Sequence, residues 1–174
     1  MRTLALSLVF SALLGACALS PTLDPGATTE AQIVSTYGQP TRRWTHPDGT
    51  TTLEYATQPA GISCFMFTVD GQGRLVNARD ALSDTNLARV QVGMTEEQVD
   101  RLLGQHANVQ FFSLSGETVW AWNIPTFGPG IAAHFDVYFK SGRVVRTGRD
   151  TIYGGDSDLV IRPPAHLPCP RCTP

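Results

Sequence analysis

The sequence predicts an α+β protein of two tandem units, each a short helical segment followed by a three-stranded antiparallel sheet. The first observation is that GMTEEQVDRLLGQ, residues 93–105, encodes a short helix with both of its ends, and that a degraded copy, ATTEAQIVSTYGQ, occupies residues 27–39. The second is that β-type segments separated by turn residues follow both copies. Two copies at so long a period indicate a duplicated domain rather than a solenoid. Chance similarity between two α+β segments is the alternative.

The later helix is defined by its caps. Thr95 can accept a hydrogen bond from the first turn, and Gln98 can reach back to the Thr95 backbone, which makes a capping box. Gly104 stands where a left-handed residue ends a helix. The apolar stripe between the caps has i, i+3, i+4 spacing and consists of Val99, Leu102 and Leu103. The earlier copy has the same capping elements at Thr29, Gln32 and Gly38.

Turn residues divide the rest of each unit into β-segments. Asp48-Gly49 and Ser115-Gly116 predict turns before the middle strand of each sheet. Residues 70–73 and Ser141-Gly142 predict the turns of the last hairpins. Three β-segments are therefore expected in each unit. Because a unit of about 60 residues is marginally stable alone, we expect the two units to share a core or pack together.

Two tryptophans stand out in the strand of the later unit. Trp120 and Trp122 are two residues apart and so lie on one side of the strand, with Leu53 and Tyr55 as their counterparts in the earlier unit. Either this pair packs against the helix in the core, or it forms a partner-binding surface, where aromatic residues are frequent hot spots. Tyr138 alternates with apolar residues of its segment and is expected to be exposed. The predicted partner surface consists of Tyr138, Trp120 and Trp122.

Three of the four cysteines lie beyond the N-terminal region. Cys64 alternates with Met66 in a strand and is expected to be a buried thiol. Cys169 and Cys172 have CxxC spacing, but they lack the preceding strand and following helix that lower the pKa of a redox-active thiol. A local disulfide is one interpretation of this pair. A redox centre and half of a zinc site shared between chains are the others.

Little in the sequence indicates catalysis. The four histidines share no metal-ligand spacing and are expected to be structural or on the surface. Gly128-Pro-Gly130 is not followed by the lysine of a phosphate-binding loop. The net charge of −2, without a basic stripe, argues against nucleic acid as a partner. We therefore expect no catalytic, cofactor-binding or metal-binding residues, and a protein that is not an enzyme.

Residues 1–16 predict a lipoprotein signal peptide. Arg2 precedes an apolar run that is too short to span a bilayer comfortably. The sequence Leu14-Gly15-Ala16-Cys17 resembles the bacterial lipoprotein signal, in which the cysteine is lipidated; cleavage nearby in an ordinary secreted protein is the alternative. A tri-acylated Cys17 would anchor the chain firmly. The Ala18 that follows implies sorting to the outer membrane, with the folded part facing the periplasm.

The remaining boundaries follow from these segments. We expect a tether at 17–27, a degenerate first repeat at 28–82, a second repeat at 83–152 and a proline-rich tail at 153–174. The tail has too few apolar side chains to offset its ordering entropy. It is therefore expected to be extended or disordered and dispensable for folding.

The later unit resembles the SmpA/OmlA (BamE-like) family of outer-membrane lipoproteins. The resemblance covers residues 85–150 in full, with NLARVQV as a short preceding helix, and residues 27–80 only loosely. It is carried by the Gly-Met-Thr helix start, the glycine at the helix end, the aromatic strand and the last hairpin. The matching residues are Gly93, Met94, Thr95, Val99, Leu103, Gly104, Trp122, Phe139, Gly142 and Val144. Gln105-His106 departs from the family, which usually has a proline there.

This resemblance implies an interaction role rather than a reaction, because the matching residues form the fold. It implies an outer-membrane-anchored module that contacts envelope proteins, the β-barrel assembly machinery among them. The tandem arrangement also resembles the secreted β-lactamase inhibitor protein, so a periplasmic binding or inhibitor module is the alternative. A thiol-redox or metal protein that uses Cys169 and Cys172 is a third hypothesis.

Overall fold

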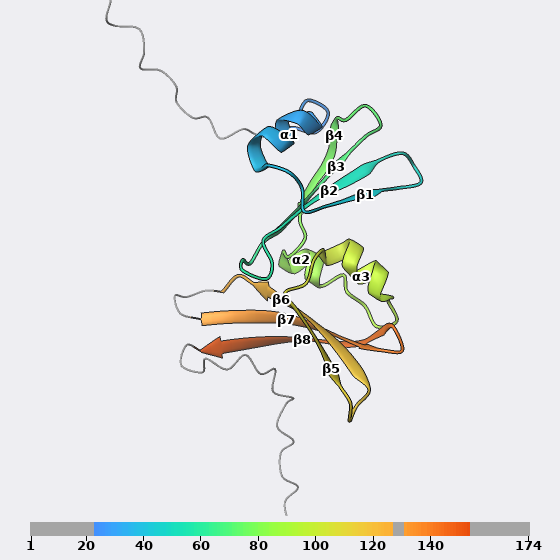
Figure 1. Ribbon diagram of the computed structural model, residues 1–174, viewed down its shortest axis with the longest axis vertical. Helices are drawn as coiled ribbons and strands as arrows, with labels where there is room; N and C mark the ends of the chain where they lie inside the picture. Colours follow the sequence, from blue (N-terminus) through green and yellow to red (C-terminus); the bar gives the residue numbers. More distant parts are fainter. Residues whose placement is uncertain (1–22, 127–130, 154–174) are drawn as a thin grey trace, which may run out of the picture.

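The computed structural model describes residues 23–126 and 131–153, which form two units (Figure 1). The first unit contains α1 (Glu30–Tyr37), β1 (Arg42–Thr45), β2 (Thr51–Ala56), β3 (Cys64–Val69) and β4 (Leu75–Asp80). The second unit contains α2 (Asp84–Leu87), α3 (Glu96–Leu103), β5 (Asn108–Phe112), β6 (Glu117–Ile124), β7 (Ile131–Lys140) and β8 (Arg143–Tyr153). In each unit the strands pair antiparallel in chain order, so each sheet is a four-stranded meander.

The α+β class with two units is confirmed, but the expectation of three strands per sheet is wrong. Each unit contains two hairpins and therefore four strands. The strands before the predicted turns at Asp48-Gly49 and Ser115-Gly116 are β1 and β5, which have only 4 and 5 residues. Segments this short carry little periodic signal of their own. Their pairing with β2 and β6 is what makes them strands.

Both long helices begin and end where the sequence predicts. The capping boxes are formed by Thr29 with Gln32 and by Thr95 with Gln98. Gly38 and Gly104 end the helices with φ of 81° and 78°. Their ψ values of −163° and −164° place them in an extended region, not in the left-handed helical one that was expected. Because that extended region is essentially restricted to glycine, both positions need glycine more strictly than expected.

Tertiary contacts repeat between the units as well. The N-cap threonine of each long helix forms an isolated bridge to the last hairpin of its own unit. The hydroxyl of Tyr55 donates to the carbonyl oxygen of Gly38 at 3.0 Å, and the indole N–H of Trp122 donates to that of Gly104 at 3.1 Å. Tyr55 and Trp122 are thus structural counterparts, as their spacing predicts.

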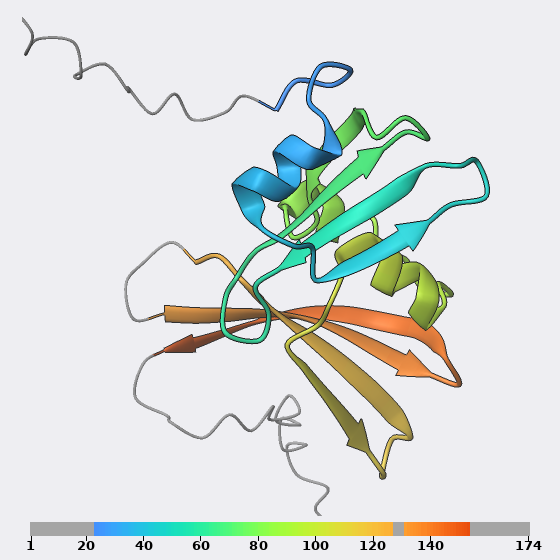
Figure 2. The same cartoon turned by 45° about the horizontal axis from the view of Figure 1, so that its top comes forward.

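The helices and sheets alternate in four layers (Figures 1 and 2). Helix α1 covers one face of the sheet β1–β4, and that sheet separates α1 from α3. Helices α2 and α3 lie between the two sheets, with β5–β8 on their other side. The sheet of the first unit is therefore covered on both faces. For this reason β2 and β3 have buried residues on each of their two faces.

Two apolar clusters form the core. The smaller one packs α1 on its sheet and contains Ile33, Leu53, Tyr55, Phe67, Val69 and Leu75. The larger one joins the units: Cys64 and Met66 of the first sheet pack with Leu103 of α3 and with Trp122 of the second sheet. The expectation of a shared core is therefore confirmed, and burial of apolar surface holds the units together.

Several predicted features lie outside the described residues. These are the signal peptide, Cys17, Gly128-Pro-Gly130, and the tail from residue 154 with Cys169 and Cys172. The proposed domain boundaries stay predictions. Within residues 23–126 and 131–153, no helix is long and apolar enough to cross a membrane.

Candidate functional site

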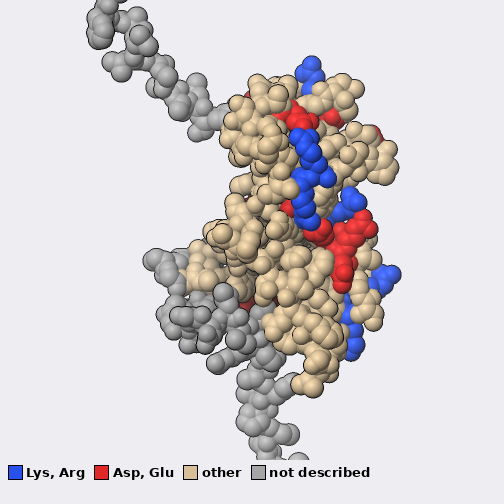
Figure 3. Space-filling model, viewed as in Figure 1, with Lys and Arg blue, Asp and Glu red and all other residues tan. Residues whose placement is uncertain are grey.

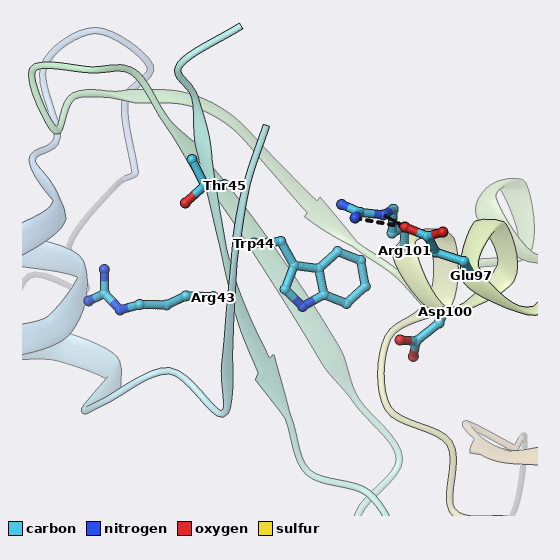
Figure 4. Close-up of a pocket in the computed structure, with 6 residues that line it drawn as sticks. All are labelled: Arg43, Trp44, Thr45, Glu97, Asp100 and Arg101. Atoms are coloured by element: carbon cyan, nitrogen blue, oxygen red, sulfur yellow. Dashed lines mark hydrogen bonds and ion pairs between the residues drawn. The ribbon is translucent and has the colours of Figure 1, made fainter. Parts of the chain in front are cut away.

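An open groove of about 340 Å³ lies between β1 of the first unit and α3 of the second. It is lined by Arg43, Trp44, Thr45, Glu97, Asp100 and Arg101 (Figure 4). Trp44 points from β1 toward α3, whereas Arg43 points to the opposite side of the strand. The groove could not be predicted from the sequence, because its two walls are more than fifty residues apart in the chain.

The groove ends on a three-residue ion-pair network that joins the units. Nη2 of Arg42 lies 2.9 Å from a carboxylate oxygen of Glu54, within its own sheet, and 2.9 Å from one of Asp100, on α3. Glu54 is fully buried, and its second oxygen also accepts from the backbone N–H of Gln105 at 2.8 Å. Burial lowers the pKa of Arg42, but hydrogen bonds to Asp100 and Glu54 outweigh burial and leave that pKa raised.

The other charged side chains of the groove are paired too. Arg101 binds Glu97 at 2.9 Å, one helical turn away, and its guanidinium lies 5.4 Å from the ring of Trp44. Arg43 pairs with Glu30 of α1. Figure 3 shows that positive and negative side chains alternate along one face of the molecule. Each of these charges therefore has a partner of opposite sign, and the Arg42–Asp100 pair together with the contact of Arg101 with Trp44 clamps the two units to each other.

Polar contacts to backbone reinforce this clamp. The guanidinium of Arg79, on β4, donates to the carbonyl oxygens of Leu102 at 2.7 Å and Arg101 at 2.9 Å. These are carbonyls at the C-terminal end of α3, where a positive charge is favoured. Across the seam, the side-chain amide of Gln58 donates to the backbone carbonyl oxygen of Asn123 and accepts from the backbone N–H of Asn123. The orientation of the two units is therefore fixed by directional bonds as well as by apolar packing.

Of the three aromatic residues predicted to face a partner, only Trp120 keeps exposed surface. Trp122 is fully buried in the shared core. Trp120 is half-buried and stacks on the ring of His106 at 4.6 Å between centroids. The expectation that Tyr138 is exposed is wrong, since it is only 7% exposed. The guanidinium of Arg146 lies over its ring, 3.2 Å from the centroid, and both faces of β7 are buried at this point.

The face of the second sheet that carries Tyr138 also holds an unusual carboxyl group. Asp136 is 1% exposed, and neither carboxyl oxygen has a hydrogen-bond partner. Burial, followed by the nearby negative charge of Asp150, raises the pKa of Asp136 to about 7. Burial likewise lowers the pKa of His134 and of His106, so both rings are neutral at physiological pH.

Nothing in the described part of the chain assembles a metal site, since no three His, Cys, Asp or Glu side chains come together there. Cys64 is free and buried, as expected. Burial raises the pKa of its thiol to about 12. The thiol is therefore protonated and unreactive at neutral pH.

A group of exposed apolar residues lies on the β5–β6 hairpin. Val109 is 46% exposed and Phe111 is 65% exposed, while Leu114 in the turn is fully exposed. Val109 is paired with Trp120 and Phe111 with Thr118, so both share the face of Trp120. We call Val109, Phe111, Leu114 and Trp120 the β5 surface. Apart from Trp120, sequence analysis missed it; the signal was an uncharged run from Asn108 to Gly116.

Comparison with known proteins finds solved structures of low similarity. No protein-family model matches the chain, and the comparison with curated proteins found no match. A crystal structure described as a candidate β-lactamase inhibitor protein from Streptococcus mutans is 15% identical over 71% of this chain and 82% of that chain, with a TM-score of 0.34. A DUF4309 family protein from Bacillus subtilis is 14% identical over 73% and 80%, with a TM-score of 0.29.

A structure described as a candidate β-lactamase inhibitor protein is thus among the structural neighbours. At these scores the likeness carries no argument about activity or partners. What the topology and contacts define is a class: a two-unit α+β protein, clamped at its seam and exposing one apolar hairpin.

Proposed function

We propose that this chain is a non-catalytic protein-interaction module that a lipid on Cys17 holds at the outer membrane, facing the periplasm. Its contacts would support the assembly of envelope proteins, including β-barrel outer-membrane proteins and their assembly machinery. The observation that carries the proposal is the β5 surface. Exposed apolar side chains gathered on one hairpin are typical of a protein contact rather than of a solvated surface.

The arrangement of the hairpin supports this choice. It projects beyond α3, away from the seam between the units (Figures 1 and 2). Trp120 at its base is anchored on His106, so an incoming side chain would meet a fixed aromatic platform. Rigid aromatic residues beside exposed apolar ones are where binding energy concentrates in protein interfaces.

The resemblance to the SmpA/OmlA family supports the envelope setting of the proposal. The predicted tether of residues 17–27 would reach at most roughly 40 Å. The β5 surface would then work close to the membrane, where outer-membrane proteins are assembled. An alternative is a periplasmic binding or inhibitor module, which is favoured by the fully exposed Leu114 at the tip of the hairpin, a shape that can enter an enzyme's cleft.

Replacing the predicted lipid acceptor should release the protein from the membrane. With Cys17→Ser we expect the chain to move from the outer-membrane pellet to the soluble periplasmic fraction, because no acyl chain can then be attached. Cell fractionation followed by immunoblotting measures the shift. Retention of the variant in the outer membrane would place the anchor elsewhere.

Partner capture tests the interaction surface itself. We expect crosslinked envelopes to yield outer-membrane proteins or assembly subunits with the tagged wild-type chain, and at least tenfold less of them with Phe111→Asp. The reason is that a charge cannot be buried unpaired in an apolar contact. Mass spectrometry identifies and quantifies the captured proteins.

Val76→Asp is the matched control, because Val76 is also on an edge strand and is 52% exposed. It should capture as much as the wild type. If both variants capture equally reduced amounts of these proteins, or if both capture as much as the wild type, the β5 surface is not the contact site. Capture of a soluble periplasmic enzyme instead of envelope proteins would favour the inhibitor alternative.

A further inference from the structure

The edges of the two sheets differ in charge. β1, β4, β5 and β8 are the outer strands of the two described sheets. The outer edges of β4 and β8 are partly occupied, because Leu75 is bonded to the backbone of Gly26 and Thr28, and Val144 to that of Gly93 and Met94. Three of these strands carry charged residues: Arg42 and Arg43 in β1, Arg79 and Asp80 in β4, and three arginines and an aspartate in β8. Charged side chains on an edge strand prevent another strand from pairing with it. β5, with the sequence NVQFF, has no charge and no proline.

Backbone groups of β5 point outward from its free edge. The N–H of Val109 donates to the side chain of Asn108 at 2.9 Å instead of to β6. Since backbone groups alternate sides along an antiparallel strand, the N–H of Phe111 faces the same outer edge. The free edge of β5 therefore offers the N–H of Phe111 as a donor and the outward carbonyl oxygens of Val109 and Phe111 as acceptors, while the N–H of Val109 is already bonded to Asn108.

We propose that β5 binds an extended segment of its partner by backbone pairing, so that the partner strand becomes a fifth strand of the sheet β5–β8. This proposal rests on the proposed function and names its mode of recognition. Addition of a strand to a sheet edge takes its affinity from main-chain hydrogen bonds and its specificity from alternate side chains.

The two faces of β5 define the partner's chemistry. Val109 and Phe111 lie on the apolar face beside Trp120, whereas Asn108, Gln110 and, at the end of the strand, Phe112 lie on the other face. A strand paired with β5 would place its apolar residues beside Val109 and Phe111 and its polar residues beside the two amides. Strands of transmembrane β-barrels have this alternation of apolar and polar residues. The partner is therefore an extended segment in which apolar and polar residues alternate, as they do in an unpaired strand of a transmembrane β-barrel.

The test uses a synthetic ten-residue peptide that alternates valine and threonine, has a lysine at each end and carries a fluorescent label. Its control has proline at the centre, which cannot complete a ladder. The peptide is titrated with the folded chain, residues 17–174, and fluorescence anisotropy gives the Kd. We expect binding of the alternating peptide and at least tenfold weaker binding of the proline peptide. Equal binding of the two peptides would overturn the proposal.

A pair of variants separates backbone pairing from side-chain contact. Phe111→Ala removes the ring and keeps the outward N–H, whereas Phe111→Pro removes both. We expect the Kd of the proline variant to be at least tenfold higher than that of the alanine variant. Equal Kd values would overturn strand pairing. A free sheet edge tolerates proline, and a thermal melt verifies that both variants are folded.

Hydrogen exchange of the wild type gives a second measurement that does not depend on the variants. The amide of Phe111 should exchange at least tenfold more slowly when the alternating peptide is bound. Unchanged exchange at a saturating peptide concentration would overturn the proposal. The two proposals can fail separately. If Phe111→Asp loses envelope partners but the alanine and proline variants have equal Kd values, the interaction function stands and only strand pairing is rejected.

Discussion

Gly104→Ala should destabilise the protein by about 4 kcal/mol, roughly twice the loss caused by Gly38→Ala at the equivalent position of the first unit. Both glycines have nearly the same backbone conformation, so both substitutions place an alanine in a region that L-residues rarely adopt. The difference comes from what surrounds them. A Cβ on Gly104 would lie 2.6 Å from Sγ of Cys64, whereas a Cβ on Gly38 would have no atom within 4 Å.

The steric part of this loss comes from contact between the units. The Cβ of an alanine at 104 would also lie 3.0 Å from Oε1 of Glu54 and 3.0 Å from Cε of Met66, both in the first unit. Overpacking a core typically costs about 1–3 kcal/mol. Because these neighbours include a buried carboxylate held by Arg42, the seam has little freedom to adjust.

Urea unfolding followed by tryptophan fluorescence measures both losses. The double variant Gly104→Ala with Cys64→Ala should recover part of the destabilisation, since it removes the sulfur that the new Cβ would meet. Equal losses for Gly38→Ala and Gly104→Ala, with no recovery in the double variant, would show that α3 does not end against the first sheet.

Arg42→Ala should destabilise the protein by about 3 kcal/mol, because it leaves Glu54 charged and fully buried without its cationic partner. Removing one member of a buried ion pair costs much more than removing a surface pair. The same change also breaks the link from β1 to Asp100 of α3. The effect therefore combines desolvation of an unpaired carboxylate with a weaker seam.

Arg43→Ala is the matched control on the next residue of the same strand. Arg43 pairs with Glu30 at the surface, where the side chains are 45% and 30% exposed. Such a pair contributes at most about 1 kcal/mol. Adding Glu54→Gln to Arg42→Ala should restore part of the lost stability, because the buried charge is then removed.

The same urea titrations decide this prediction. If Arg42→Ala lowers the free energy of unfolding by no more than Arg43→Ala does, the charge of Glu54 is balanced in another way. The clamp described for the groove is then wrong. If the double variant is less stable than Arg42→Ala alone, the buried charge is not the source of the loss.

Features that depend on neighbours within one turn or one hairpin could be predicted from the sequence. The capping boxes of Thr95 and Thr29 need only a residue three positions away, and they are present as expected. The turn at Ser141-Gly142 likewise follows from its two residues, which both have positive φ. The two-unit α+β class was predictable for the same reason, because each unit repeats this local pattern.

The strand count shows where local reasoning fails. β1 and β5 are too short to show a period, and they are strands because β2 and β6 supply their hydrogen bonds. The prediction that Tyr138 is exposed fails for a related reason. Alternation along β7 predicts one buried and one exposed face, but whether the second face meets solvent depends on residues from other strands, such as Arg146.

The clamp and the candidate contact surface were decided by the tertiary structure alone. Arg42 meets Asp100 across 58 positions of sequence, and Glu54 meets the N–H of Gln105 across 51. The β5 surface is exposed because α3 covers only part of its sheet, which no property of Val109 or Phe111 encodes. Local conformation follows from a residue's own sterics and hydrogen bonds, whereas burial, ion pairing and free sheet edges depend on how whole elements pack.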